Sequence, residues 1–241
     1  MNEIVKDGAN KNNNKGKVVL VGHSLGGYLS ARYLLKNPNS VHKLVLASPV
    51  GFPSKPKTAL KGSQLPTTFR VIDALWSSNV TPQQLVRMMG ASRGSRNTKR
   101  GLLGRIPHLR GKSPKEEEEF NLLAEYLYHI TVADPSGEFA MNSLLEPAIS
   151  PDSAGVYARE PLEDSFLPKY LNSEKDSTLK SVTVLFGDHD WMRPNEYSAR
   201  TTIQNLQQHS GGIQGSVEII PNAGHHLYLD NPRDFVKSIV D

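Results

Sequence analysis

The chain has 241 residues, of which 37% are hydrophobic and 22% charged, with a formal net charge of +4 and an isoelectric point near 9.2. This composition is typical of a globular chain, and the length predicts one domain with room for an inserted lid. The lack of cysteine excludes disulfides, thiolate metal sites and a cysteine nucleophile, and it fits a reducing, intracellular compartment. No apolar run approaches the roughly 20 residues that span a bilayer, so any membrane contact is expected to be peripheral.

The beginning of the chain predicts an α/β fold. Residues 1–16 are polar and rich in asparagine and lysine, and we expect them to be disordered, with folded structure over residues 17–241. An apolar strand is predicted at residues 18–21, followed by a helix at 25–35 and a second strand at 41–47. This order favours parallel strands joined by a right-handed crossover.

The middle of the chain departs from this pattern. From residue 54 to about residue 169, loops rich in glycine, proline, serine and arginine alternate with helical pieces at 82–89 and 116–132. We interpret this part as a cap inserted over the sheet. The core then resumes with two strands and two helices, predicted at residues 181–186, 198–209, 215–220 and 232–240.

Basic residues are concentrated in the predicted cap. The stretch from Arg87 to Lys115 has no acid and carries Arg87, Arg93, Arg96, Lys99, Arg100, Arg105, Arg110, Lys112 and Lys115. With its apolar neighbours, this stretch is either a surface that rests on anionic lipid headgroups or a solvated lid, and both interpretations stay open. We expect no nucleic acid binding, because no known module or interleaved aromatic residues accompany the charge.

A candidate nucleophile follows the first predicted strand. Gly22, Ser24 and Gly26 form a G-x-S-x-G pattern between a strand and a helix, as a nucleophile elbow requires. We expect a Cβ at Gly22 or Gly26 to collide with the neighbouring backbone. The alternative is that Ser24 caps the following helix. His23 is expected to contact nearby backbone rather than to catalyse.

A serine nucleophile needs a base, and the base needs a carboxylate that orients it. Asp188 and Asp190 follow the third predicted strand, and His225 and His226 follow the fourth. Loops after parallel strands meet at one edge of a sheet, so we expect these side chains to converge on Ser24.

Together these motifs resemble the lipid-acting α/β-hydrolases of the branch that contains abhydrolase domain proteins four and five and their fungal relatives, including a mitochondrial cardiolipin deacylase. Besides the elbow, the resemblance rests on residues 46–53, 126–129, 135–138 and 223–230. It implies an α/β-hydrolase fold with a mostly parallel sheet and an inserted helical cap. It also implies a location in the cytoplasm or on the surface of mitochondria, endoplasmic reticulum or lipid droplets.

The resemblance implies a role for each candidate residue. Ser24 is the nucleophile, Asp190 the orienting acid and His225 the base, while the backbone N–H of Leu25 donates to the oxyanion. Asp188 stays open as an alternative acid, because a shift of two residues in a loop is easily misjudged. His226 is expected to line the pocket.

His225 and Asp230 also form an H-x-x-x-x-D pattern. In glycerolipid acyltransferases this pattern pairs a base with a carboxylate, and relatives in the branch carry it. The alternative, purely structural interpretation is that Asp230, which precedes Asn231 and Pro232, caps the last helix.

We therefore predict a serine hydrolase that cleaves carboxylic esters of lipids, such as phospholipids or lysophospholipids, without a metal or cofactor. Two alternatives stay open: a lysophosphatidic acid acyltransferase, and a non-catalytic lipid-associated scaffold or inactive fragment.

The resemblance further implies strands that this chain lacks. Family members carry several strands and a His-Gly loop before the elbow strand, whereas 17 residues precede Val18 here. We therefore expect an N-terminally truncated form that lacks the second oxyanion donor, a loss that costs about 100- to 1,000-fold in rate.

Overall fold

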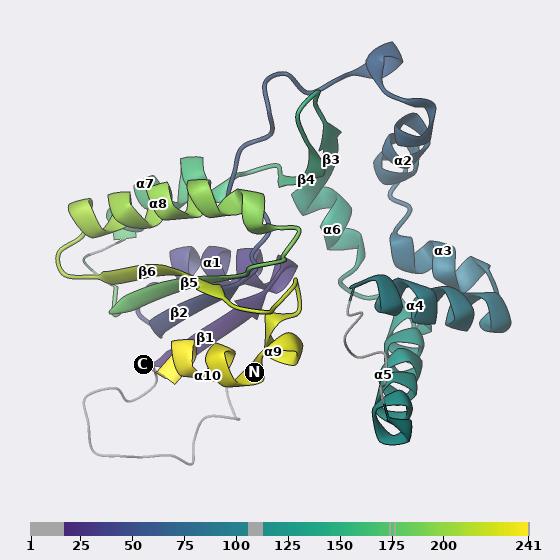
Figure 1. The fold of residues 1–241 in the computed structure, drawn as a ribbon. Coiled ribbons are helices and arrows are strands. Elements are labelled where there is room, and N and C mark those ends of the chain that lie inside the picture. Colours follow the sequence, from purple (N-terminus) through teal and green to yellow (C-terminus); the bar gives the residue numbers. More distant parts are fainter. Residues whose placement is uncertain (1–16, 106–112, 174, 176, 241) are drawn as a thin grey trace.

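The structure, a computed structural model, describes residues 17–105, 113–173, 175 and 177–240; the segment 1–16, expected to be disordered, lies outside these residues. At its centre is a four-stranded sheet with the order β1-β2-β5-β6 (Figure 1). The strands are β1 (Val18–His23), β2 (Val41–Ala47), β5 (Ser181–Gly187) and β6 (Gln214–Ile220). All pairings in this sheet are parallel, so the carboxyl ends of the four strands meet at one edge.

Helices cover both faces of the sheet (Figure 1). One face carries α1 (Leu25–Lys36), α7 (Leu162–Ser173) and α8 (Glu196–His209), and the other carries α9 (Leu227–Asp230) and α10 (Pro232–Val240). The mostly parallel sheet with helices on both faces confirms the predicted α/β fold class.

Side chains of β2 fill the core on both sides of the sheet. Leu44 and Leu46 pack in the cluster under α1, α7 and α8, whereas Val45 and Ala47 pack in the cluster under α9 and α10. Such continuous burial explains why this strand reads as an unbroken apolar run rather than an alternating one. Within the described sheet β1 is an edge strand, and its Val19 and Val21 are exposed.

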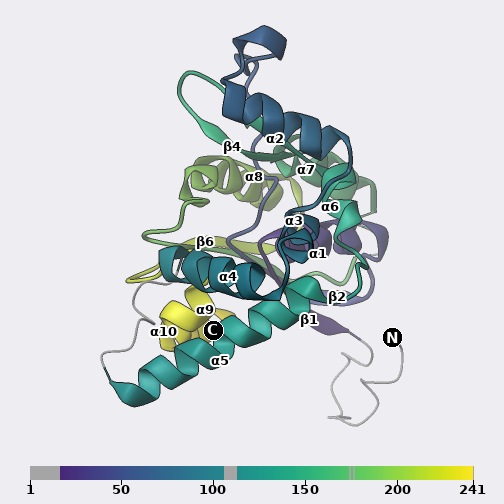
Figure 2. The same ribbon diagram turned by 90° about the vertical axis from the view of Figure 1, so that its right-hand side faces the viewer.

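The helical layer beside the sheet begins with the short 3-10 helix η1 (Gly62–Gln64). It continues with α2 (Thr67–Ser77), α3 (Pro82–Met88), α4 (Ala91–Arg105), α5 (Pro114–Val132) and α6 (Phe139–Leu144). Figure 2, which views the molecule from that side, shows α3, α4 and α5 in front of the sheet. We call this layer the cap, and it has its own small core of Leu102, Phe120 and Ala124.

Polar contacts also join the cap helices. The guanidinium of Arg87 on α3 forms an ion pair with Glu138, which precedes α6, and donates to the carbonyl of Thr131 on α5 at 3.1 Å. The buried hydroxyl of Thr81 donates to the same Glu138 carboxylate at 2.6 Å. Arg87 thus connects α3 with α5 and with the residue before α6, and Glu138 binds both ends of this arrangement on α3.

The end of the cap differs from expectation. An antiparallel hairpin of β3 (Leu145–Ile149) and β4 (Ala154–Ala158) follows α6. Pro147 makes β3 hard to predict from the sequence, because proline in a sheet is confined to edge strands, the first residues of strands and bulges. Leu162, Phe166 and Tyr170 of α7 pack in the main core, so the chain returns to the core before the expected limit near residue 169.

Candidate active site

Ser24 lies at the turn between β1 and α1. Its backbone has φ 54° and ψ −119°, a conformation that a residue with a side chain rarely adopts. The Ser24 N–H donates to the carbonyl of Ala47 at 2.9 Å, which ties the turn to the end of β2. The Ser24 side chain makes no capping hydrogen bond to α1. The turn therefore presents the hydroxyl at the carboxyl edge of the sheet instead of using it as a cap.

Two glycines allow the close approach of strand and helix at this turn. A Cβ on Gly22 would lie 2.4 Å from both the carbonyl oxygen of Gly26 and the hydroxyl of Ser30. A Cβ on Gly27 would lie 3.0 Å from the Cβ of Pro49. A Cβ on Gly26 would meet no atom within 4 Å, so the expected collision at that position is wrong. The tight contact uses the backbone of Gly26 and leaves its Cα facing open space.

His225 connects Ser24 with Asp190. Its Nε2 lies 3.1 Å from the hydroxyl oxygen of Ser24, and its Nδ1 lies 3.0 Å from Oδ1 of Asp190. With the ring proton on Nδ1, the imidazole donates to the carboxylate and accepts from the serine hydroxyl. The three side chains come from the loops after β1, β5 and β6, which end at the same edge of the sheet.

Asp190 is buried, with an exposed fraction of 4%. Burial by itself raises the pKa of this carboxyl, but contacts with the imidazole of His225, the hydroxyl of Ser48 and the backbone N–H of Met192 lower it, and the net pKa is below the ordinary value. The Met192 N–H donates to Oδ1 at 2.8 Å. Asp190 is therefore held ionised beside the imidazole at neutral pH.

Asp188, the alternative acid, binds backbone instead of the imidazole. Its two carboxylate oxygens accept from the N–H groups of Asn222 and Ala223, each at 2.9 Å. Burial raises its pKa, yet these two bonds and the nearby His189 bring it below the ordinary value. Asp188 thus fastens the loop that carries His225 to the loop that carries Asp190.

Asp230 also binds the loop that carries His225. Its Oδ2 accepts from the N–H of Gly224 at 2.7 Å. The expectation that Asp230 caps the last helix is wrong, because Asn231 does so, its Oδ1 accepting from the N–H of Asp234 at 3.2 Å. Asp230 is the last residue of α9 and points back toward the preceding turn, a direction that sequence alone does not give.

His23 holds the same loop from the elbow side. Its Nε2 bonds the carbonyl oxygen of His225 at 2.8 Å, and its ring centroid lies 4.7 Å from that of His225. Burial lowers the pKa of His23 below its ordinary value, although the bond to the His225 carbonyl opposes the shift. The ring of His226 lies 5.3 Å from the ring of His23 and 5.5 Å from that of His225.

We call residues 221–226 the histidine loop, and side chains hold its backbone at five successive residues. The carbonyl of Pro221 accepts from the Asn231 side chain at 2.9 Å. Asp188, Asp230 and His23 bind the next four residues as described above. The backbone that carries His225 is therefore fixed from three directions.

Two neighbours of the triad were not among the residues predicted from the sequence. Ser48, fully buried and with φ 45°, follows β2 and lies beside Asp190. Trp191 directly follows Asp190, and its ring centroid lies 4.9 Å from that of His225. Their position could have identified both residues, because each lies in a loop at the carboxyl edge of the sheet, where the triad also lies.

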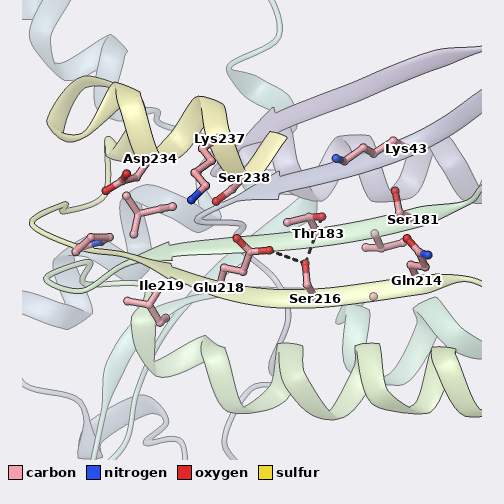
Figure 3. A pocket seen from close by; sticks show the side chains of 14 residues that line it. Lys43, Ser181, Thr183, Gln214, Ser216, Glu218, Ile219, Asp234, Lys237 and Ser238 are labelled. Atoms are coloured by element: carbon pink, nitrogen blue, oxygen red, sulfur yellow. Dashed lines mark hydrogen bonds between the residues drawn. The ribbon is translucent and has the colours of Figure 1, made fainter. Parts of the chain in front are cut away.

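A separate cavity of about 450 Å³ lies between the sheet and α10 (Figure 3). Its lining includes Lys43, Ser181, Thr183, Ser216, Glu218 and Lys237. Some of these groups already have hydrogen-bond partners: Ser216 donates to the Glu218 carboxylate at 2.9 Å, and Lys43 donates to the carbonyl of Ile239 at 2.6 Å. Ser24, Asp190 and His225 do not line this cavity, so it is distinct from the triad.

Two features are absent from the part of the chain that the structure describes. No group of three or more histidine, aspartate or glutamate side chains there is placed to hold a metal ion. No helix there combines the length and apolar character needed to cross a membrane.

Comparison with protein families gives one match over most of the chain. The profile of the alpha/beta hydrolase fold family matches residues 9–232. A hydrolase from Pseudomonas aeruginosa PA01 has a similar structure, with a TM-score of 0.51 and 17% identity, covering 93% of this chain and 64% of that one. At this level of identity the structural likeness supports the fold alone.

Curated relatives are similar over nearly the whole chain. A probable 1-acylglycerol-3-phosphate O-acyltransferase from Oryza sativa subsp. japonica is 32% identical over 238 residues, which cover 95% of this chain and 50% of the relative. The human 1-acylglycerol-3-phosphate O-acyltransferase ABHD5 is 31% identical over 229 residues, which cover 93% and 58%. These matches confirm the resemblance to the abhydrolase domain branch. The chain spans about half the length of the relatives it matches.

Proposed function

Because the chain belongs to the alpha/beta hydrolase fold family, we propose that it transfers the acyl group of a lipid ester first to Ser24 and then to water. The observation that carries the proposal is the pair of hydrogen bonds made by His225, one to the Ser24 hydroxyl and one to the Asp190 carboxylate. This arrangement matches the needs of a serine nucleophile with an oriented base.

In the first half of the reaction, the Ser24 oxygen attacks the carbonyl carbon of the ester while its proton moves to Nε2 of His225. The ionised Asp190 stabilises the imidazolium that forms, and Nδ1 keeps its proton. The negative charge on the carbonyl oxygen faces the N–H of Leu25, the first residue of α1, where N–H groups have no acceptor within the helix. The imidazolium then protonates the leaving alkoxide, and an acyl-Ser24 ester remains.

In the second half, water attacks the acyl-Ser24 carbonyl. His225 Nε2 takes a proton from the water, and the same proton returns to the Ser24 oxygen when the ester bond breaks. The products are a carboxylic acid and the free enzyme, so each proton removed is restored.

The lipid character of the substrate rests on the relatives. Two of them are named for acyl transfer to 1-acylglycerol-3-phosphate, which is a glycerolipid ester. We infer that phospholipid or lysophospholipid esters are the substrate class for this chain.

A second candidate function, lysophosphatidic acid acyltransferase, is favoured by those same names. It differs in the acyl acceptor, since the hydroxyl of 1-acylglycerol-3-phosphate replaces water and acyl-CoA supplies the acyl group. The H-x-x-x-x-D version of this reaction needs Asp230 as the partner of the base. Both ring nitrogens of His225 already face Ser24 and Asp190, so Asp230 supports the histidine loop in either reaction.

One experiment distinguishes the two functions. The protein is incubated with a lysophospholipid ester, with and without acyl-CoA, and labelled in parallel with a fluorophosphonate, using Ser24→Ala as the control. Labelling at Ser24 and fatty acid release without acyl-CoA support hydrolysis. Product formation only with acyl-CoA overturns it in favour of acyl transfer, and a lipid-binding protein that neither labels nor turns over supports the scaffold alternative.

A further inference from the structure

We propose that the exposed side of α4, together with the end of α3, docks the cap on an anionic lipid surface. The proposal rests on the proposed function and extends it, because a protein docked through its cap is held at the phase in which ester lipids reside. The docking surface consists of Arg93, Arg96 and Arg100, which we call the arginine face, with Met88 and Met89 beside it.

The arginine face follows from helical spacing. Arg93, Arg96 and Arg100 are three and four residues apart, which places them on one side of α4, and all three are exposed. The opposite side carries Gly94 and Leu102, which are buried against α5. A Cβ on Gly94 would lie 3.0 Å from the ring of Tyr128 on α5. The arginines therefore point away from the body of the cap.

No acidic side chain of the described residues forms an ion pair with this face, at Arg93, Arg96 or Arg100. The acids that begin α5 lie beside the last turns of α4, beyond Arg93 and Arg96, because Gly94 faces Tyr128 while Lys99 bonds Asn121. A basic face without ion pairs among the described residues fits a partner with dense negative charge.

Apolar side chains adjoin the arginine face. Met88 is 79% exposed and Met89 is 44% exposed at the end of α3. The sulfur of Met89 contacts the side-chain amide of Asn97, which lies one turn from Arg93 on the same side of α4. Basic side chains next to exposed, flexible apolar ones are the combination by which peripheral proteins bind the headgroup region of a bilayer.

Lipid is favoured over a protein partner by this geometry. The arginine face is a single helical stripe, and each cation near an anionic membrane adds about fivefold to its affinity without needing a matched partner residue. The neighbouring methionines are flexible and apolar, so they can insert between lipids without a matched pocket in the partner.

Vesicle sedimentation tests the proposal. The whole protein is mixed with vesicles of phosphatidylcholine alone or of equal parts phosphatidylcholine and phosphatidylserine, at low and high salt. We expect binding to the anionic vesicles, weakened by salt, and a loss on the order of 100-fold in affinity for R93Q/R96Q/R100Q. Met88→Ser with Met89→Ser should weaken binding in a way that salt does not change.

A matched variant controls for net charge. K36Q/R233Q/K237Q removes the same number of charges from exposed positions on α1 and α10 and should bind anionic vesicles nearly as wild type does. Equal loss in both triple variants, or equal binding to neutral vesicles, overturns the proposal. Thermal unfolding of each variant shows that it is folded. Ser24→Ala should bind vesicles like wild type, so docking and catalysis can fail separately.

Discussion

The carboxylate of Asp230 accepts a hydrogen bond of 2.7 Å from the backbone N–H of Gly224, the residue before the proposed base. The H-x-x-x-x-D spacing therefore has a structural explanation in this chain, because a carboxylate five residues after the histidine reaches back across α9 to the turn before it. The imidazole itself takes its carboxylate partner from another loop, at Asp190. One motif thus contains a proposed base and a residue that positions its backbone.

Substitution of the two carboxylates should separate these roles. Asp190→Asn replaces the carboxylate with an amide whose NH2 donates to Nδ1; this favours the wrong imidazole tautomer, removes the charge that stabilises the imidazolium, and should lower kcat about 10,000-fold. Asp230→Asn keeps an oxygen that accepts from Gly224 and should lower kcat less than about tenfold. Steady-state kinetics on a soluble ester measure both. The reverse order of effects would contradict the proposed triad and support Asp230 as the partner of the base.

Asp188 should matter for both stability and rate. Asp188→Ala leaves two N–H groups of the histidine loop without their acceptor, and the Ala223 N–H is in a buried residue. We expect a loss of about 1 to 3 kcal/mol in the free energy of unfolding. We also expect a fall in kcat with little change in KM, because the loop carries the base and not the substrate.

A matched variant makes the Asp188 test specific. Glu163→Ala removes a carboxylate on α7 that also accepts from a backbone N–H, that of Ser54, and that lies outside the histidine loop. Denaturant unfolding measures the stability of both variants, and steady-state kinetics measures their kcat. We expect a lower kcat for Asp188→Ala than for the control. A decrease in kcat that is the same in both would show that Asp188 acts through general stability alone.

The two elbow glycines should respond differently to alanine. Gly22→Ala places a Cβ 2.4 Å from the Gly26 carbonyl oxygen, and because backbone cannot move aside cheaply, we expect the free energy of unfolding to fall by about 3 kcal/mol. Gly26→Ala meets open space in the first turn of α1 and should leave stability unchanged or raise it by up to about 1 kcal/mol. Thermal unfolding of the two variants checks the order.

Much of the core and the residues of the candidate site could be predicted because local pattern determines them. The apolar run of β2 and the helical pieces predicted at residues 82–89 and 116–132 agree with β2, α3 and α5 within one or two residues. Convergence of the loops follows from parallel strand order, and it brings together Ser24, Asp190 and His225.

Other features depend on contacts between distant segments and could not be predicted. The hairpin of β3 and β4 is stabilised by pairing that Pro147 obscures, and the direction of Asp230 depends on the turn between Gly224 and α9. The clearance at Gly26 depends on which side of the backbone faces the strand, a detail that the G-x-S-x-G pattern leaves open.

The lowered pKa of His23 predicts a dependence of stability on pH. Burial is the largest cause, and it holds the folded-state pKa below the ordinary value of 6.5. As the pH falls through 6.5, the unfolded chain takes up a proton at this residue that the folded chain does not, so the free energy of unfolding decreases until the folded-state pKa is reached. His225 and Asp190 face His23 and are present in both proteins compared below.

His23→Gln removes this titration and keeps an amide that donates to the His225 carbonyl. Between about pH 7.5 and about pH 5.5, we expect the wild type to lose more free energy of unfolding than the variant. Urea unfolding at several pH values measures the difference. Parallel stability curves for the two proteins would mean that His23 is protonated as readily in the folded chain as in the unfolded one, and that its ring is not held neutral between the elbow and the histidine loop.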